Sequence, residues 1–326
     1  MKDILGIEIS NKTVKFVEIK RNSLRNFAVV ELPDNIVVNG QLVAPEAMSE
    51  VLKNTFKKEK FSVKNCALVL SDNDVYLRRM KVPAMSEKQL LLNMPYEFKD
   101  VLAEGKDKYI YDYSMISLNK NEDDEVVDME LLGAVVRKDV IDKYIDMFKR
   151  ASLKLVKALP REIALCSLVN ELNGDNDNKD FAILDLGYKS SKMDIFANGV
   201  YEVTRTIDIG LEDVVKVVAD VLGVDIHMAS KYLDQNQNNI QENERCVDIY
   251  SSIATEVMRV MNYYTFENPN NTLETLYYCG GGSKIEPYTK EIKETISLDL
   301  EPLSSLKQDA SEAILMSAAA LGACYD

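Results

Sequence analysis

One strand-and-turn pattern occurs twice in this 326-residue chain. The first copy reads Ile-Leu-Gly-Ile-Glu-Ile-Ser over residues 4–10, and the second reads Phe-Ala-Ile-Leu-Asp-Leu-Gly over residues 181–187. Both are apolar runs that end in an acidic residue, one apolar residue and a small residue, and two lysines follow at the same offsets in each. Each copy continues into a second strand, a turn and a third strand. The repeat therefore predicts two similar halves, each built on a β-meander.

Composition restricts the partners and the compartment. The formal net charge of -14 argues against a nucleic-acid partner, because phosphate binding needs a basic surface, and an anionic membrane should repel the chain as a whole. The five cysteines form no Cys-x-x-Cys pair, which is typical of reduced cytosolic thiols. The start has no signal-peptide core, and the apolar stretch 313–324 is too short to span a bilayer. We therefore expect a cytoplasmic protein.

Residues 75–150 read as strand, helix, two strands and helix, which predicts a small α+β module inserted into the first half. Within it, Ser86 and Gln89 have capping-box spacing, and Pro95 is expected to kink or end the helix. The polar run 173–178 is the clearest linker. In the second half, a hairpin turn is predicted at Asn198-Gly199, and four helices are predicted at about 211–222, 226–234, 244–266 and 308–323.

Two acidic turns are candidates for binding a phosphate group. In the first, backbone N–H groups could cradle phosphate while a lysine adds charge, and its candidate residues are Glu8, Ser10, Asn11 and Lys15. In the second, glycine allows close backbone approach and the aspartate could hold a metal-bound water, and its candidate residues are Asp185, Gly187, Tyr188 and Lys189. Each turn alone would also suit an ordinary strand connection.

A third candidate follows a buried strand at 273–279 and precedes a helix, and consists of Gly280, Gly281, Gly282 and Ser283. Backbone without side chains can admit an adenine and a ribose, although the same four residues would also suit a flexible turn. The three motifs in this order, together with the duplication, favour one nucleotide site over three unrelated turns.

This order of motifs resembles the actin-like superfamily, which includes sugar kinases, heat-shock ATPases and FtsA. Within it, the chain is most similar to the PilM family of type IV pilus assembly proteins, and the similarity extends to segments 32–40, 82–87 and 319–322. The resemblance implies an α/β actin-like fold of two ribonuclease-H-like subdomains in tandem, with a 1C-type inserted module and a helical 2B-type elaboration. It implies these boundaries: 1A at 1–74 and 151–175, 1C at 75–150, 2A at 176–210 and 267–326, and 2B at 211–266.

The resemblance also implies ATP and Mg²⁺ between the halves, with Glu8 and Asp185 nearest the metal. Two residues depart from the family pattern. Glu8 stands where aspartate is usual, and Ser10 stands where glycine is usual, which costs about 1 to 2 kcal/mol if that position needs a positive φ. We therefore expect ATP binding with weak or absent hydrolysis, and assign no catalytic residue.

The partner implied by the resemblance is the N-terminal cytoplasmic tail of PilN, held in a groove between the first subdomain and the inserted module. An extended tail suits a half-exposed strand, so we place the groove near residues 75–82, with Arg78 and Arg79 as polar anchors. The pilus assembly ATPase is a second candidate partner, and self-association stays open. The protein is then expected at the inner face of the cell membrane, held there only through its partners.

Two other functions fit the superfamily. A small-molecule kinase needs a base beside the acceptor hydroxyl, and we cannot place one. An FtsA-like division protein usually has an amphipathic helix after a linker, whereas the last apolar helix here is followed directly by the final residues. The single histidine, His227, is expected to be a surface or packing residue, and the run 175–180 lacks the glycine and glutamate of a calcium loop. The lysines at 57–60 are expected to end a helix.

Overall fold

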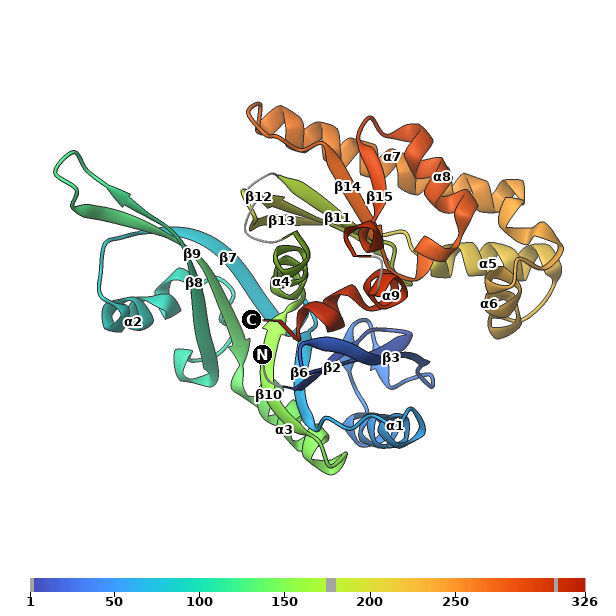
Figure 1. Ribbon diagram of the computed structural model, residues 1–326, viewed down its shortest axis with the longest axis horizontal. Coiled ribbons are helices and arrows are strands. Elements are labelled where there is room, and N and C mark those ends of the chain that lie inside the picture. Colours follow the sequence, from blue (N-terminus) through green and yellow to red (C-terminus); the bar gives the residue numbers. More distant parts are fainter. Residues whose placement is uncertain (1–2, 174–179, 308–309, 326) are drawn as a thin grey trace. The chain divides into compact units, whose positions relative to one another are not determined.

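The computed structural model describes residues 3–173, 180–307 and 310–325, and the chain divides into two compact units (Figure 1). Unit 1 comprises residues 1–165 and 322–326, and unit 2 comprises residues 166–321. Most of the predicted linker (173–178) and of the calcium-loop-like run (175–180) falls on residues 174–179, outside the described residues, as do 308 and 309 at the predicted start of the last helix.

Unit 1 is built on a five-stranded sheet in the order β10-β6-β1-β2-β3. Its first three strands in the sequence form an antiparallel meander, while β6 and β10 run parallel to β1. The strands are β1 (Ile4–Ile9), β2 (Thr13–Lys20), β3 (Ser23–Glu31), β6 (Asn65–Leu70) and β10 (Lys154–Pro160). Helices α1 (Pro45–Lys58) and α3 (Lys138–Arg150) pack together in the core of this unit, where Leu52 and Phe148 are fully buried. A short hairpin, β4 (Val37–Val38) and β5 (Gln41–Leu42), precedes α1.

The inserted module of unit 1 has its own three-stranded sheet in the order β7-β9-β8. Its elements are β7 (Val75–Pro83), α2 (Glu87–Glu97), the short 3-10 helix η1 (Lys106–Lys108), β8 (Tyr109–Lys120) and β9 (Val126–Arg137). Apolar residues of α2 and of one sheet face form the module's core. The capping box at Ser86 is confirmed. The helix continues past Pro95 to Glu97, so Pro95 does not end it.

Unit 2 repeats the topology of unit 1, in the order β13-β12-β11-β14-β15. Again three strands form an antiparallel meander, and two further strands run parallel to the first of them. The strands are β11 (Phe181–Asp185), β12 (Ser191–Ala197), β13 (Val200–Ile207), β14 (Thr275–Cys279) and β15 (Asp299–Pro302). Asn198 and Gly199 both have positive φ, 51° and 73°, as a two-residue hairpin turn requires. The duplication predicted from the sequence is thus confirmed in the two sheets.

Helices supply most of the core of unit 2, where Tyr250 and Tyr288 stack with ring centroids 4.9 Å apart. The helices that follow β13 are α5 (Leu211–Leu222), α6 (Ile226–Asp234), α7 (Glu244–Glu267), α8 (Glu286–Thr295) and α9 (Ser311–Gly322), with 3-10 helices η2 (Gln237–Glu242), η3 (Gly281–Lys284) and η4 (Leu303–Leu306). Helix α4 (Arg161–Asn173) begins in unit 1 and ends in unit 2. Among the described helices, none is both long and apolar enough to cross a bilayer.

Candidate functional site

The first acidic turn, between β1 and β2, contains a nearly buried ion pair. Glu8 and Lys15 face each other across the antiparallel strands, and Lys15 Nζ lies 2.8 Å from Glu8 Oε1. Their side chains are only 11% and 13% exposed. The second carboxylate oxygen, Glu8 Oε2, is buried and has no hydrogen-bond partner among the described residues. A buried carboxylate oxygen without a partner is costly, so this atom is suited to receive a ligand or a metal-bound water.

The other two residues of this turn fix its shape. Ser10 Oγ donates to the carbonyl oxygen of Thr13 at 2.9 Å, and Asn11 Oδ1 accepts from the backbone N–H of Gly40 at 2.7 Å. Ser10 is not among the described residues with positive φ, so the strain considered for a serine at this position does not arise. Both side chains hold the turn in place, and Asn11 ties it to the β4–β5 hairpin.

The second acidic turn, between β11 and β12, is shaped by close backbone contacts. A Cβ atom at Gly187 would lie 2.5 Å from the carbonyl oxygen of Ser190, so only glycine fits there. The Gly187 carbonyl in turn accepts from the N–H of Leu211, at the start of α5. Tyr188 packs, half-buried, against the core of unit 2, and Lys189 Nζ lies 2.8 Å from Glu212 Oε1.

The glycines of the third motif lie beside this second turn. Asp185 and Cys279 are register partners in the parallel pair β11–β14, so the ends of the two strands meet. Gly280 has φ +90°, and a Cβ there would collide with the Asp185 carboxylate and lie 2.9 Å from the Leu186 carbonyl oxygen. Gly282 N–H donates to that same carbonyl at 2.9 Å. The structure thus brings two of the three predicted motifs together inside unit 2.

The remaining residues of the third motif close this short turn. Ser283 Oγ donates to the Gly280 carbonyl at 2.6 Å, and Gly281 opens the 3-10 helix η3. The Asp185 carboxylate therefore lies beside glycine backbone that carries no side chain. A carboxylate suits a phosphate-bound metal, and backbone without side chains allows the close approach of a nucleoside. The four residues predicted in the first turn are likewise grouped together, within unit 1.

A pocket of about 350 Å³ lies on one face of the module sheet in unit 1. Alternate residues of a strand point to one face, so Val75 and Leu77 of β7 line it together with Ala134 of β9. Ala158 and Pro160, at the end of β10, form part of its wall. Asp112 is the one charged residue of its described lining. The pocket is thus an apolar groove between the first sheet and the module.

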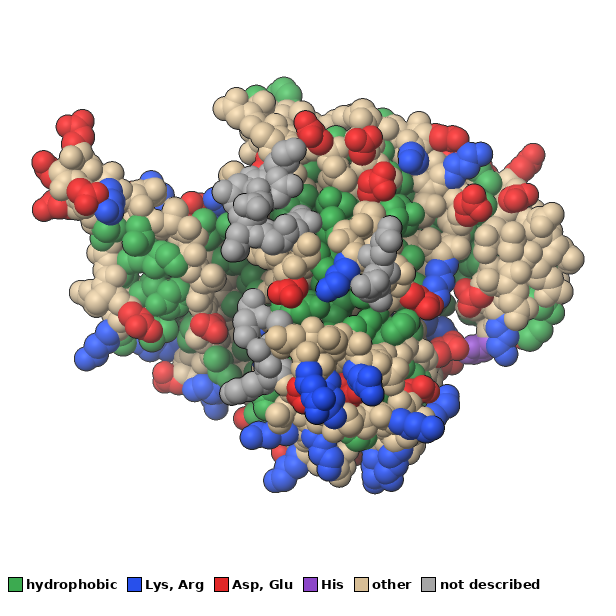
Figure 2. All heavy atoms as spheres, in the orientation of Figure 1, with side chains coloured by type: hydrophobic (Ala, Val, Ile, Leu, Met, Phe, Trp, Pro, Cys, Tyr) green, Lys and Arg blue, Asp and Glu red, His purple; other side chains and the backbone are tan. Residues whose placement is uncertain are grey.

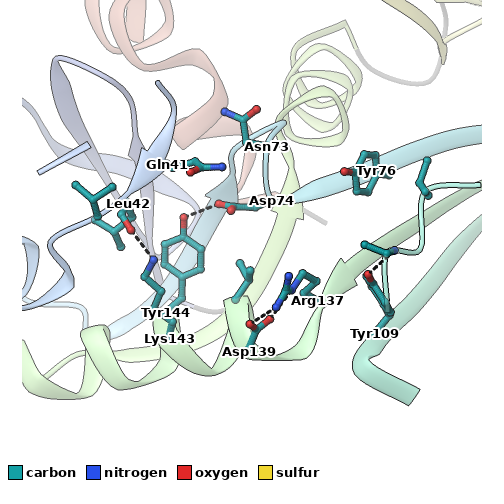
Figure 3. A pocket seen from close by; sticks show the side chains of 14 residues that line it. Gln41, Leu42, Asn73, Asp74, Tyr76, Tyr109, Arg137, Asp139, Lys143 and Tyr144 are labelled. Atoms are coloured by element: carbon teal, nitrogen blue, oxygen red, sulfur yellow. Dashed lines mark hydrogen bonds and ion pairs between the residues drawn. The ribbon is translucent and has the colours of Figure 1, made fainter. Parts of the chain in front are cut away.

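A second pocket, of about 610 Å³, involves Tyr76, which lies on the opposite face of β7 (Figure 3). It is polar: Tyr144 donates to Asp74 Oδ2 at 2.7 Å, and Lys143 donates to the carbonyl oxygen of Leu42. Burial raises the pKa of the Asp74 carboxyl, against the effect of the Tyr144 hydrogen bond. Nothing in the sequence pattern had pointed to this pocket, because its lining comes from segments far apart in the chain.

The two predicted anchors, Arg78 and Arg79, point to opposite faces of β7. The Arg78 guanidinium binds Asp100 bidentately, at 2.6 and 2.8 Å, and donates to the Glu97 carbonyl beside α2. Arg79 Nε donates to Glu130 Oε1 at 2.6 Å, on the face that carries the apolar pocket. Both side chains are engaged within the module, and only Arg79 shares a face with the groove.

The described residues hold no cluster of three or more His, Cys, Asp or Glu side chains with metal-binding geometry. His227 lies in the first turn of α6, where its N–H is capped by Asp225. The candidate metal contacts are therefore single carboxylates, Glu8 in unit 1 and Asp185 in unit 2. Single carboxylates fit Mg²⁺, which keeps most of its waters and takes its other ligands from phosphate.

The two sheets of matching topology and the three turn motifs define an actin-like ATPase fold. The family model described as type IV pilus assembly protein PilM matches residues 6–311, so this chain belongs to the PilM family.

Solved structures share the fold. A PilM-PilN type IV pilus biogenesis complex superposes with a TM-score of 0.82 at 19% identity, over 98% of this chain and 96% of that one. The ethanolamine utilization protein EutJ from Carboxydothermus hydrogenoformans gives a TM-score of 0.61 at 12% identity, over 98% and 90% of the chains. An archaeal actin homologue gives 0.52 at 11% identity, over 99% and 98%. At these identities the likeness shows the fold alone.

Proposed function

We propose that this chain is a cytoplasmic scaffold of type IV pilus assembly that binds ATP and holds the N-terminal cytoplasmic tail of PilN. Membership of the PilM family supports the pathway, and the shared fold with a PilM-PilN complex supports the partner. The observation that carries the proposal is the apolar groove between the first sheet and the module. In this role the chain would link the inner-membrane platform to the pilus motor, with the assembly ATPase as a second partner.

The finer architecture belongs to the same proposal. The two sheets with their helices would be ribonuclease-H-like subdomains 1A and 2A, residues 75–150 a 1C-type module, and residues 211–266 a 2B-type elaboration. The matching order and direction of the strands in the two sheets support this division. The protein would lie at the inner face of the cell membrane, held there through PilN.

We propose that this chain binds ATP with Mg²⁺, and that the candidate contacts are the residues of the turn motifs described above. The unpartnered Glu8 Oε2 and the bare backbone at Gly280 fit such a ligand. When bound, Mg²⁺ would supply positive charge to the phosphates. Lys15 is already paired with Glu8, so it adds little net charge toward a transition state, and no general base is assigned. This supports nucleotide binding with weak or absent hydrolysis.

Calorimetric titration with ATP and Mg²⁺ tests this part of the proposal. Asp185→Asn should weaken binding at least about tenfold, because it removes a charge that a metal-phosphate group needs. Asp208→Asn is the matched control, since Asp208 is an exposed acid of the same unit. If the wild-type chain binds no nucleotide, the nucleotide part of the proposal is wrong.

Peptide binding tests the groove. A synthetic peptide with the N-terminal sequence of PilN should bind the full chain, and Ile110→Lys should abolish binding by placing a charge in the apolar pocket, where Ile110 is 40% exposed. Tyr76→Lys is the matched control, since Tyr76 is 48% exposed and lines the polar pocket instead. If only the Tyr76 variant loses binding, the tail binds in the polar pocket and not in the apolar groove.

A further inference from the structure

Three connections of unit 1 meet at one end of its five-stranded sheet. Because β1, β6 and β10 run parallel and β2 runs antiparallel to β1, the starts of β6 and β10 lie at the same end as the β2–β3 turn. Hydrogen bonds join these segments: Lys154 N–H donates to the Lys64 carbonyl at 2.8 Å, and Lys20 Nζ donates to Ser62 Oγ at 3.2 Å. We call residues 20–25, 57–64 and 149–154 together the basic end.

The basic end carries ten Lys and Arg residues and one acid, Glu59, in a chain whose net charge is -14. The ten are Lys20, Arg21, Arg25, Lys57, Lys58, Lys60, Lys64, Lys149, Arg150 and Lys154. All except Lys20 are exposed. Figure 2 shows Lys and Arg side chains gathered at the lower end of unit 1, around α1 and α3. The Asp3 carboxylate also lies there, where it accepts from the Arg21 N–H at 3.0 Å.

Helix ends explain only part of this charge. α1 and α3 both end here, and basic residues in a last helical turn offset the negative end of the helix dipole. Two of the helix-end residues are also paired, Arg150 with Glu46 at 2.5 Å and Lys58 with Glu59 at 3.5 Å. Five basic residues lie outside the two helices, in turns and at strand starts, so the helix dipole does not explain their presence. Within the described part of the chain, no ion pair is found for these five. These are Arg21, Arg25, Lys60, Lys64 and Lys154.

We propose that the basic end binds the anionic phospholipid surface of the cell membrane. The proposal rests on the proposed function, in which the tail of a membrane protein brings the chain to that surface. Each Lys or Arg within a Debye length of an anionic leaflet strengthens binding about fivefold. The acidic remainder of the chain is repelled, so the attraction also sets the orientation of unit 1. The net charge alone predicts repulsion from such a surface, but the basic end differs in charge from the rest of the chain.

The chemistry of the basic end favours lipid over nucleic acid. Proteins that bind single strands combine positive charge with exposed aromatic rings on which bases stack. The one aromatic residue of the three segments, Phe61, is 5% exposed and packs against Phe16. The basic end therefore has positive charge but no exposed aromatic ring on which a base could stack. Such a surface suits a fluid anionic membrane, because each lysine or arginine can contact a lipid headgroup independently.

The two sites of unit 1 set a minimum length for the tail. The apolar pocket contacts Ala158 and Pro160 near the end of β10, whereas the basic end includes Lys154 at its start. Seven residues of strand span about 20 Å. A tail docked in the pocket therefore needs at least about six extended residues before it reaches the membrane.

Sedimentation with lipid vesicles tests the proposal on the full chain. Vesicles with about one third phosphatidylglycerol, in about 0.1 M salt, should bind the wild-type chain, and vesicles of phosphatidylcholine alone should not. The variant R21Q/R25Q/K64Q/K154Q should bind at least about tenfold more weakly. The matched control, K88Q/K108Q/K290Q/K293Q, removes four exposed lysines elsewhere and should bind as the wild type does.

Three results would overturn this inference: equal binding to both kinds of vesicle, equal loss in the two variants, or binding of the basic end to RNA with none to anionic vesicles. The PilN peptide separates this inference from the proposed function. The basic-end variant should keep full peptide affinity, because none of its four residues lines the apolar pocket. If vesicle binding holds while the peptide does not bind, only the proposed partner is wrong.

Discussion

The two acidic turns have the same strand topology but are stabilised in different ways. In the β1–β2 turn, side chains bond to one another and to nearby backbone: Lys15 to Glu8, and Asn11 to Gly40. In the β11–β12 turn, backbone segments approach so closely that Gly187 and Gly280 cannot carry a Cβ without displacing a neighbour. A duplicated scaffold can therefore keep its fold while one copy relies on polar side chains and the other on glycine. The two copies should respond differently to substitution.

The largest effect is expected at Gly280. Gly280→Ala places a Cβ against the Asp185 carboxylate at φ +90°, and should lower the free energy of unfolding by about 4 kcal/mol, from overpacking and backbone strain together. Urea unfolding measures this. Gly105→Ala is the control, since a Cβ there meets nothing within 4 Å and φ is -60°. Equal stability of the two variants would show that the second turn does not depend on glycine at this position.

A somewhat smaller effect is expected at the ion pair of the first turn. Lys15→Met leaves the nearly buried Glu8 carboxylate without its cation, and should lower the free energy of unfolding by about 2 to 3 kcal/mol. The double variant E8Q/K15M should recover part of this loss, because the unpaired charge is gone. A double variant no more stable than Lys15→Met would show that the pair does not act through charge.

Asn11→Ala should have a moderate effect. It leaves the Gly40 N–H without its acceptor and should cost about 1 kcal/mol of unfolding free energy. Asn11→Asp keeps an oxygen acceptor at this position and should stay close to the wild type in the same urea experiment. If the two variants are equally destabilised, the hydrogen bond is not what fixes the first turn.

The smallest effect is expected at the ion pair of the second turn. Lys189→Met should cost less than about 0.5 kcal/mol, because Lys189 is 44% exposed and water screens its attraction to Glu212. Burial acts to raise the pKa of the Glu212 carboxyl, but hydrogen bonds from Lys189 and Lys216 outweigh it and hold the pKa below its ordinary 4.5. The stability advantage of the wild type over Lys189→Met should therefore be present above pH 4.5, and it should be lost as the pH falls through the lowered pKa of Glu212. If Lys189→Met lowers the free energy of unfolding as much as Lys15→Met does, the two ion pairs do not differ in their contribution to stability.

Local patterns sufficed for most of the secondary structure. The repeated strands, the Asn198-Gly199 turn and the capping box at Ser86 are signals within a few residues, and all three are confirmed. Strand β10 was missed, because its segment is short, carries two lysines and ends in Pro160. It becomes a strand by pairing with β6, and that pairing is a tertiary contact.

For the candidate site, the sequence indicated groups of residues but not the contacts that they make. Arg78 and Arg79 were predicted as anchors because they lie on a half-exposed strand, but neighbouring residues of a strand point to opposite faces, and here each binds a different acid. The polar pocket at Asp74 and Tyr144 carried no sequence signal. Its lining combines loops, a strand and a helix that come together only in the folded unit.

By itself, the sequence determined the duplication, the order of the three turn motifs and the resemblance to the PilM family, because strand periodicity and turn chemistry act over a few residues. Only the tertiary structure decided which side chains meet: Glu8 with Lys15, Asp185 with Gly280, and the three connections that form the basic end. These meetings depend on pairing and packing between strands far apart in the chain. Such pairing is set by the burial of whole sheet faces, so no single segment encodes it.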